Sequence, residues 1–266
     1  MRLAILTLAA LLVPVAAVAQ IYATPTEPPR TTDPAALKRS IVRREIHERF
    51  QRGLAAEARG DWSAAVPEFR RAVALEPAEP QGSTALYDLA LAEAHLHHDR
   101  EAMRLFEAAL ARDPGFAAAA ANVVGVALDA GDVARARAAA ERFVRIAPAG
   151  ALALYDAGLT ALRAGDYGAA RESFRALIAA DSKYAVAHYD LGLAEVRREQ
   201  LDAALGEFQA ALNLSPHYAR ARFALASVLL RLGRRDEARG ELERCAKDAV
   251  DPSLQAIATD LRAQIK

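Results

Sequence analysis

Apolar residues recur at intervals of three and four along most of this chain, in segments that are separated by Gly and Pro. This spacing places the apolar side chains on one face of an α-helix, and Gly and Pro mark the places where helices end. Ala and Leu dominate the segments. The pattern predicts an all-α protein built from short amphipathic helices.

One motif returns along the chain at a spacing of 34 residues. It reads Gly-Asp-Trp or Gly-Asp-Tyr in its best copies, with Ala, Phe and Ala at fixed distances behind. Its clearest copies are "GLAAEARGDWSAAVPEFRRAVALEP", "AGLTALRAGDYGAARESFRALIAAD" and "LGLAEVRREQLDAALGEFQAALNLSP". These segments resemble the tetratricopeptide repeat, a helix-turn-helix unit that stacks on copies of itself.

The resemblance holds over six copies, each 34 residues after the last except for three extra residues before the second; they start at Ile46, Ser83, Ala117, Ala151, Ala185 and Ala219. The eighth position is Gly, Ala or Val and the twentieth is always Ala, because paired helices approach closely only where side chains are small. The twenty-fourth position is large and apolar in five copies: Phe69, Phe106, Phe174, Phe208 and Leu242. The resemblance implies a right-handed α-solenoid of about six helix-turn-helix repeats.

The repeats are expected to occupy residues 46–250, with a helical extension at 33–45 and a capping helix at 251–266. Asp33-Pro34 and Asp251-Pro252 each have the features of a helix cap followed by a first turn. A single repeat cannot bury its own apolar stripe, so the core consists of contacts between neighbours. The capping helix would shield the last repeat from water.

Residues 1–19 have the features of a secretory signal, with Arg2, a short apolar run, and Ala17-Val18-Ala19 before Gln20. We expect export, to the periplasm of a bacterium, and a Pro/Thr-rich tether at 20–32. The apolar run is too short to span a bilayer comfortably, so no membrane-spanning segment is expected after cleavage; an uncleaved anchor is the alternative. The single Cys245 is expected to be a small buried hydrophobe rather than a nucleophile.

The family resemblance places the first helix of each repeat on the concave side of the stack. There the fifth position is aromatic in five copies and the ninth is Leu in four, and residues four apart share a helix face. Asp recurs beside them at the sixth position and Arg at the thirteenth. We interpret this surface as a partner-binding groove with an apolar floor and charged edges. Its predicted residues are Tyr87, Asp88, Leu91, Tyr155, Asp156, Leu159, Arg163, Tyr189, Asp190, Leu193, Arg197, Phe223 and Arg231.

The sixth position departs from the family, in which a neutral Asn is usual. Asp accepts hydrogen bonds but does not donate them, and it repels carboxylates. Members that bind chaperone C-termini hold the carboxylate with Lys at the fifth position and Asn at the sixth and ninth, whereas this chain has Tyr, Asp and Leu. The pattern favours a peptide with apolar anchors and a basic or amide-rich segment. Tyr at the fifth position is common in the family whatever the partner, so part of the stripe belongs to the scaffold.

Other candidate chemistry is weak. His95 and His98 could share a helix face as metal ligands, but they fall where other copies carry the Gly-Asp turn, and a metal site needs a third ligand. No Gly-rich phosphate loop, metalloprotease motif or nucleophile elbow occurs. The sequence therefore predicts no enzymatic activity, no catalytic or metal-binding residues and no cofactor.

The helical extension and its continuation are rich in basic residues: Lys38, Arg39, Arg43, Arg44, Arg49 and Arg52. Glu45 with Arg49 and Glu48 with Arg52 are i,i+4 pairs, which favours a salt-bridged face over a docking patch for an anionic surface. Lys+Arg and Asp+Glu both total 34, and basic and aromatic residues do not alternate as they do in nucleic-acid-binding segments. A nucleic-acid partner is disfavoured.

Together these features predict a non-catalytic exported adaptor or scaffold that binds a protein or peptide. They identify neither that partner nor the oligomeric state. One alternative is a cell-envelope or polysaccharide-binding protein whose exposed aromatic rings stack on sugars. Another is an accessory subunit of an envelope assembly or secretion machine, which rests on fold analogy alone.

Overall fold

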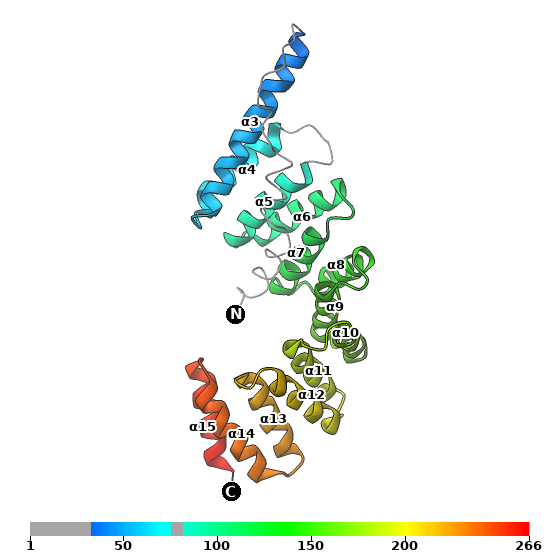
Figure 1. Ribbon diagram of the computed structural model, residues 1–266, viewed down its shortest axis with the longest axis vertical. Coiled ribbons are helices and arrows are strands. Elements are labelled where there is room, and N and C mark those ends of the chain that lie inside the picture. Colours follow the sequence, from blue (N-terminus) through cyan, green and yellow to red (C-terminus); the bar gives the residue numbers. More distant parts are fainter. Residues whose placement is uncertain (1–32, 76–81, 266) are drawn as a thin grey trace. The chain divides into compact units, whose positions relative to one another are not determined.

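The computed structural model describes residues 33–75 and 82–265, which form thirteen α-helices and no β-strand. The predicted signal at 1–19 and tether at 20–32 lie outside the described residues. The helices divide between two compact units, of which the first ends at Ala147 and the second begins at Pro148. Within each unit every helix packs against the next one along the chain (Figure 1). The predicted all-α solenoid is confirmed.

The helices of the first unit are α3 (Pro34–Glu57), α4 (Trp62–Leu75), α5 (Gly82–His95), α6 (Asp99–Arg112), α7 (Ala117–Asp129) and α8 (Val133–Ile146). Those of the second unit are α9 (Ala151–Arg163), α10 (Tyr167–Ala180), α11 (Ala185–Arg197), α12 (Leu201–Leu214), α13 (Ala219–Arg231), α14 (Arg235–Asp248) and α15 (Pro252–Gln264).

The Gly-Asp motif builds the turn between the two helices of a hairpin. Gly131 and Gly165 adopt φ angles of 75° and 77°, a left-handed conformation that Gly reaches without steric cost. The next residue then caps the second helix: the carboxylate of Asp132 accepts a hydrogen bond from the N–H of Arg135, and Asp166 accepts one from Ala169. Each residue of the motif therefore has a separate structural task.

Glycine at the eighth position lets the two helices of a hairpin pack around a phenylalanine. A Cβ atom added to Gly158 would lie 2.6 Å from the ring of Phe174, and one added to Gly192 would lie 2.6 Å from Phe208. Both rings are completely buried. The small eighth position and the aromatic twenty-fourth position are therefore two halves of one contact.

This contact predicts that Gly192→Ala destabilises the protein by about 1–3 kcal/mol, because the added methyl group overpacks the ring of Phe208. Gly206→Ala is the matched control, since Gly206 also lies in a helix but has open space around its Cβ position; it should be neutral or stabilising by up to about 1 kcal/mol. Urea denaturation followed by circular dichroism measures both. Equal effects from the two substitutions would contradict this account of the hairpin.

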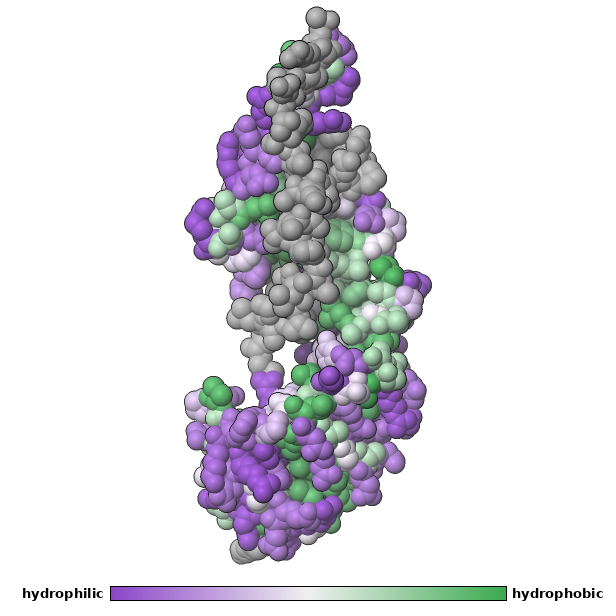
Figure 2. Space-filling model, in the orientation of Figure 1, coloured by the Kyte–Doolittle hydropathy of each residue, from purple (hydrophilic) through white to green (hydrophobic). Residues whose placement is uncertain are grey.

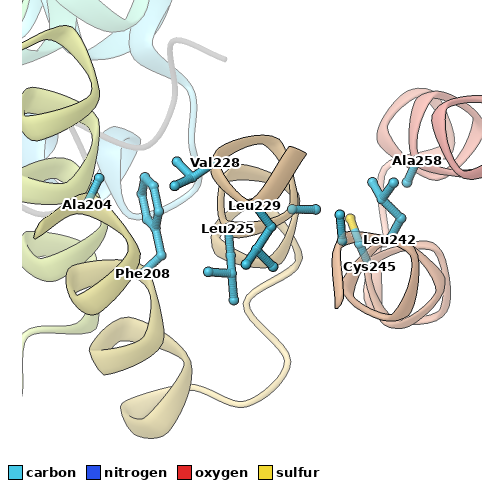
Figure 3. Close-up of a cluster of buried hydrophobic side chains, with 10 residues drawn as sticks. Ala204, Phe208, Leu225, Val228, Leu229, Leu242, Cys245 and Ala258 are labelled. Carbon is cyan, nitrogen blue, oxygen red and sulfur yellow. The ribbon is translucent and has the colours of Figure 1, made fainter. Parts of the chain in front are cut away.

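Helix α15 closes the core of the second unit. Its Ala258 lies with Leu242 and Cys245 of α14 in a cluster of buried side chains that continues through α13 to Phe208 (Figure 3). The side chain of Asp251 caps the helix by accepting the N–H of Ser253. Cys245 is buried, and its thiol donates to the carbonyl of Ala219. Ala258 is the one buried residue of α15, and most of the others are exposed.

Candidate functional site

The first helices of the three hairpins of the second unit carry an apolar surface that is partly open to solvent. Their fifth, ninth and twelfth positions fall on one helix face, and all of the side chains there are partly exposed. We call the eight apolar ones the apolar strip: Tyr155, Leu159 and Leu162 of α9, Tyr189, Leu193 and Val196 of α11, and Phe223 and Leu230 of α13. Figure 2 shows hydrophobic surface over α11 and α13 with hydrophilic surface on either side.

Arginine ends each of these three helices. Arg163, Arg197 and Arg231 are the last residues of α9, α11 and α13, and all three are exposed. Arg231 forms an ion pair with Glu199, with 2.5 Å between Nη2 and Oε2. Arg163 and Arg197 form no ion pair with any described residue. A cation at a helix C-terminus interacts favourably with the helix dipole, but two of these charges have no carboxylate partner.

The acids of the predicted site do not form an exposed edge, which corrects the sequence-based expectation. Asp156 and Asp190 are only 4% and 7% exposed. Burial raises the pKa of Asp156 to about 7. Burial also raises the pKa of Asp190 to about 6, although the hydrogen bond from Tyr155 opposes the shift. These carboxyls therefore lie beneath the surface and are partly protonated near neutral pH.

Tyrosine at the fifth position links successive hairpins. The hydroxyl of Tyr155 donates to Oδ2 of Asp190 over 3.0 Å. In the first unit, Nδ2 of Asn122 donates to the hydroxyl of Tyr87, also over 3.0 Å. In both units the fifth position of one repeat thus bonds to the sixth position of the next, so these groups stabilise the stack of repeats.

This link predicts that Tyr155→Phe lowers the free energy of unfolding by about 1–3 kcal/mol, because Asp190 is then buried without its donor. The effect should be largest at pH 8, where Asp190 is ionised and the hydrogen bond is charge-assisted. Tyr189→Phe is the matched control, because the Tyr189 hydroxyl makes no hydrogen bond to a described residue. Thermal or urea unfolding of both variants is the measurement. If both lost the same free energy of unfolding, the hydrogen bond to Asp190 would not be the cause.

The remaining predicted residues lie on α5 of the first unit. Tyr87, Asp88 and Leu91 are all buried, and Oδ2 of Asp88 has no hydrogen-bond partner. Burial raises the pKa of Asp88 well above its ordinary value. Whether α5 contributes to a partner site stays a prediction.

The sequence interpretation missed the aromatic residues that end the repeats. The ring of Tyr218 lies 5.1 Å from that of Tyr189, and the ring of Phe116 lies 4.9 Å from that of Tyr87. Both occupy the position just before the next first helix, where Tyr184 also stands. An aromatic residue thus recurs at the last position of the repeat, and this pattern in the sequence could have identified both residues.

The other sequence candidates have structural partners. The ring of His95 stacks on Trp62 at 3.8 Å, and Nδ1 of His98 lies 2.6 Å from the buried Glu93. The described part of the chain holds no group of three His, Cys, Asp or Glu side chains that could bind a metal. None of the helices in residues 33–75 and 82–265 is long and apolar enough to cross a membrane.

The ion pairs of α3 differ from the expected ones. Arg52 does pair with Glu48, at 3.5 Å. Arg49 instead pairs with Glu68 of α4 at 3.2 Å, and Glu45 pairs with Arg71 of α4 at 3.3 Å. The expected Glu45–Arg49 pair was therefore wrong, because side chains of the neighbouring helix lie within reach of both residues.

Comparisons with known proteins agree with this architecture. Among solved structures, a tetratricopeptide repeat protein from Parabacteroides merdae is similar with a TM-score of 0.73 and 17% identity, over 82% of this chain and 86% of that one. YrrB, described as a tetratricopeptide repeat protein with an unusual peptide-binding site, has a TM-score of 0.58 and 17% identity over 72% of this chain and 97% of that one. MamA has a TM-score of 0.57 and 22% identity over 60% and 94%.

These identities are low, so the structural likeness shows the fold alone. A search of curated proteins found no match. Profiles described as tetratricopeptide repeat match residues 50–115, 100–151, 124–185, 155–219 and 195–265. These matches cover most of the chain, which therefore belongs to the tetratricopeptide repeat family.

Proposed function

We propose that this chain is a non-catalytic scaffold that holds a segment of a partner protein on the apolar strip of its second unit. The single observation that carries the proposal is the strip itself. Its eight apolar side chains lie on three successive hairpins and are partly exposed, and a contiguous apolar patch with a polar rim is typical of interaction sites. The tetratricopeptide repeat is generally a protein-interaction fold, and YrrB is a member with a peptide-binding site.

We expect the leucines of the strip, rather than its tyrosines, to supply most of the binding free energy. Leu159 and Leu193 stand at the same position of successive repeats and are partly exposed, whereas the hydroxyl of Tyr155 is already bonded to Asp190. An apolar side chain of a partner gains about 1.5–3 kcal/mol when it is fully buried. A few such anchors would dominate affinity.

Export to the periplasm remains part of the proposal, on the strength of the signal features at 1–19. The polysaccharide alternative has less support, because the rings of Tyr155 and Tyr189 contact buried Phe174 and Phe208 at centroid distances of 6.0 and 5.9 Å. Those contacts leave less ring surface for stacking on a sugar.

The experiment is a crosslinking pull-down from envelope extract with the chain and with a Leu159→Gln/Leu193→Gln variant that circular dichroism shows to be folded. We expect the unaltered chain to capture one specific protein that the Leu159→Gln/Leu193→Gln variant does not capture. Leu214→Gln is the control, because Leu214 is 42% exposed but lies at the end of α12, outside the strip. Equal capture by all three proteins would exclude the strip as the binding site. Capture of glycan without protein would support the polysaccharide alternative instead.

A further inference from the structure

The exposed charge beside the apolar strip is positive. Arg163 and Arg197 are exposed at the ends of α9 and α11, and neither forms an ion pair or donates a hydrogen bond to a described residue. Arg231 continues the row on α13, where Glu199 pairs with it. Arg220, the second residue of α13, adds another exposed guanidinium near the other end of that helix.

The negative charges near the strip do not balance these guanidiniums. Asp156 and Asp190 are buried, and their pKa values are raised toward neutrality. Glu195 of α11 is buried too, and it is neutralised by Arg171 and Arg198 at 3.0 and 2.8 Å. Exposed acids follow α9 and α11 as well: Asp166, which caps α10, and Glu199 and Asp202. Glu199 pairs with Arg231, whereas Arg163 and Arg197 have no carboxylate partner among the described residues. These two guanidiniums give the apolar surface a basic edge.

We propose that the apolar strip binds an acidic segment of a partner protein, with apolar side chains on the strip and carboxylates against Arg163 and Arg197. This inference rests on the proposed function and names the class of partner. A planar guanidinium can hold a carboxylate through two parallel hydrogen bonds, and Arg is suited to such contacts at interfaces. An acidic partner is the opposite of the basic or amide-rich peptide that the sequence predicts. That expectation rests on exposed acids, and Asp156 and Asp190 are buried.

The position of the arginines also limits how the segment lies. Arg163 and Arg197 occupy the same place on successive hairpins, as Leu159 and Leu193 do one turn earlier on the same helices. A segment that crosses the hairpins would meet two or three apolar side chains of the strip and one guanidinium per repeat. A ligand with acidic and apolar residues interspersed fits this pattern, whereas a purely acidic run leaves the strip uncovered.

The test is selection of peptides from a phage-displayed random library on the purified chain. We expect the enriched peptides to combine Asp or Glu with Leu, Ile, Phe or similar residues. Arg163→Glu/Arg197→Glu should abolish their enrichment. The matched control is Arg145→Glu/Arg175→Glu, which makes the same change of charge at exposed positions of α8 and α10 and should leave the enrichment unchanged.

Fluorescence anisotropy with one selected, labelled peptide then measures the effect. We expect the affinity to fall at least about tenfold in Arg163→Glu/Arg197→Glu, because each reversal replaces attraction by repulsion. For the unaltered chain it should fall by a similar factor as NaCl is raised to about 0.5 M, since salt screens exposed charges.

The possible outcomes separate this inference from the proposed function. Selection of apolar peptides without acids, lost in Leu159→Gln/Leu193→Gln but kept in the charge-reversed variant, overturns the inference and leaves the scaffold function standing. Selection of basic peptides overturns it in favour of the sequence-based expectation. No selection at all overturns both. A dimer in analytical ultracentrifugation that the charge reversal dissociates also overturns it, since a second copy would then occupy the strip.

Discussion

Phe174→Ala should lower the free energy of unfolding by about 3–5 kcal/mol, the usual cost of emptying a buried aromatic site. Phe174 is completely buried, with Gly158 of the paired helix against one side of its ring and Tyr155 at a centroid distance of 6.0 Å. The cavity would open in a buried cluster that Phe174 shares with Ala170 of its own hairpin and with Leu191 and Ala194 of the next one. Because each repeat contacts only its neighbours, we expect unfolding of the second unit to become less cooperative.

Urea denaturation followed by circular dichroism measures this loss. Phe223→Ala is the comparison, because Phe223 is on the apolar strip and only partly buried, and its loss should cost clearly less. If the two substitutions had the same effect, Phe174 would not be the centre of its hairpin.

Asp156→Asn should stabilise the protein at pH 8 by about 2–4 kcal/mol, because each unit of pKa shift corresponds to about 1.4 kcal/mol. An aspartate ordinarily has a pKa of 3.8, which applies to the unfolded chain, and burial raises the pKa of Asp156 to about 7 in the folded protein. Below pH about 4 the carboxyl is neutral in both states. Between the unfolded pKa of 3.8 and the folded pKa of about 7, the unfolded chain ionises this carboxyl while the folded protein keeps it protonated, so stability is lost as the pH rises. Above the folded pKa the loss is complete and the folded protein buries the charge. Asn removes that charge and keeps the shape of the side chain.

The measurement is the midpoint of urea unfolding at pH values from about 4 to 8. The two proteins should have similar stability at the acidic end and diverge as the pH rises. Asp260→Asn is the control, since Asp260 is exposed on α15 and should leave the profile unchanged. A variant whose stability falls with pH as steeply as that of the unaltered chain would contradict the assignment.

The fold was largely predictable from the sequence because its main contacts are local. The eighth and twenty-fourth positions of a repeat, such as Gly192 and Phe208, meet within one hairpin, so a 34-residue pattern reveals their pairing. The same holds for the capping of α10 by Asp166, three residues before Ala169. In the third repeat, where Ala140 replaces the aromatic residue, Phe143 is buried one turn later.

The site was harder to predict, because helical periodicity gives the direction of a side chain and not its depth. Asp190 directly follows Tyr189 of the apolar strip, so the sequence pattern predicted an exposed acidic edge beside the strip. Its burial depends on how one hairpin stacks on the next, which also brings Tyr155 within 3.0 Å of it. The pairing of Arg49 with Glu68 depends on packing between helices in the same way. Such contacts are set by tertiary structure, and a single sequence does not encode them as a pattern.

Binding of a partner protein to the apolar strip of the second unit can be tested by photocrosslinking in the cells that produce the chain. For this test p-benzoylphenylalanine is placed at Leu193 on the strip or at Ala176, which is exposed on α10. We expect Leu193 to give a crosslink to one defined protein and Ala176 to give none. The same crosslinks from both positions, or a specific one from Ala176 alone, would contradict binding to the strip.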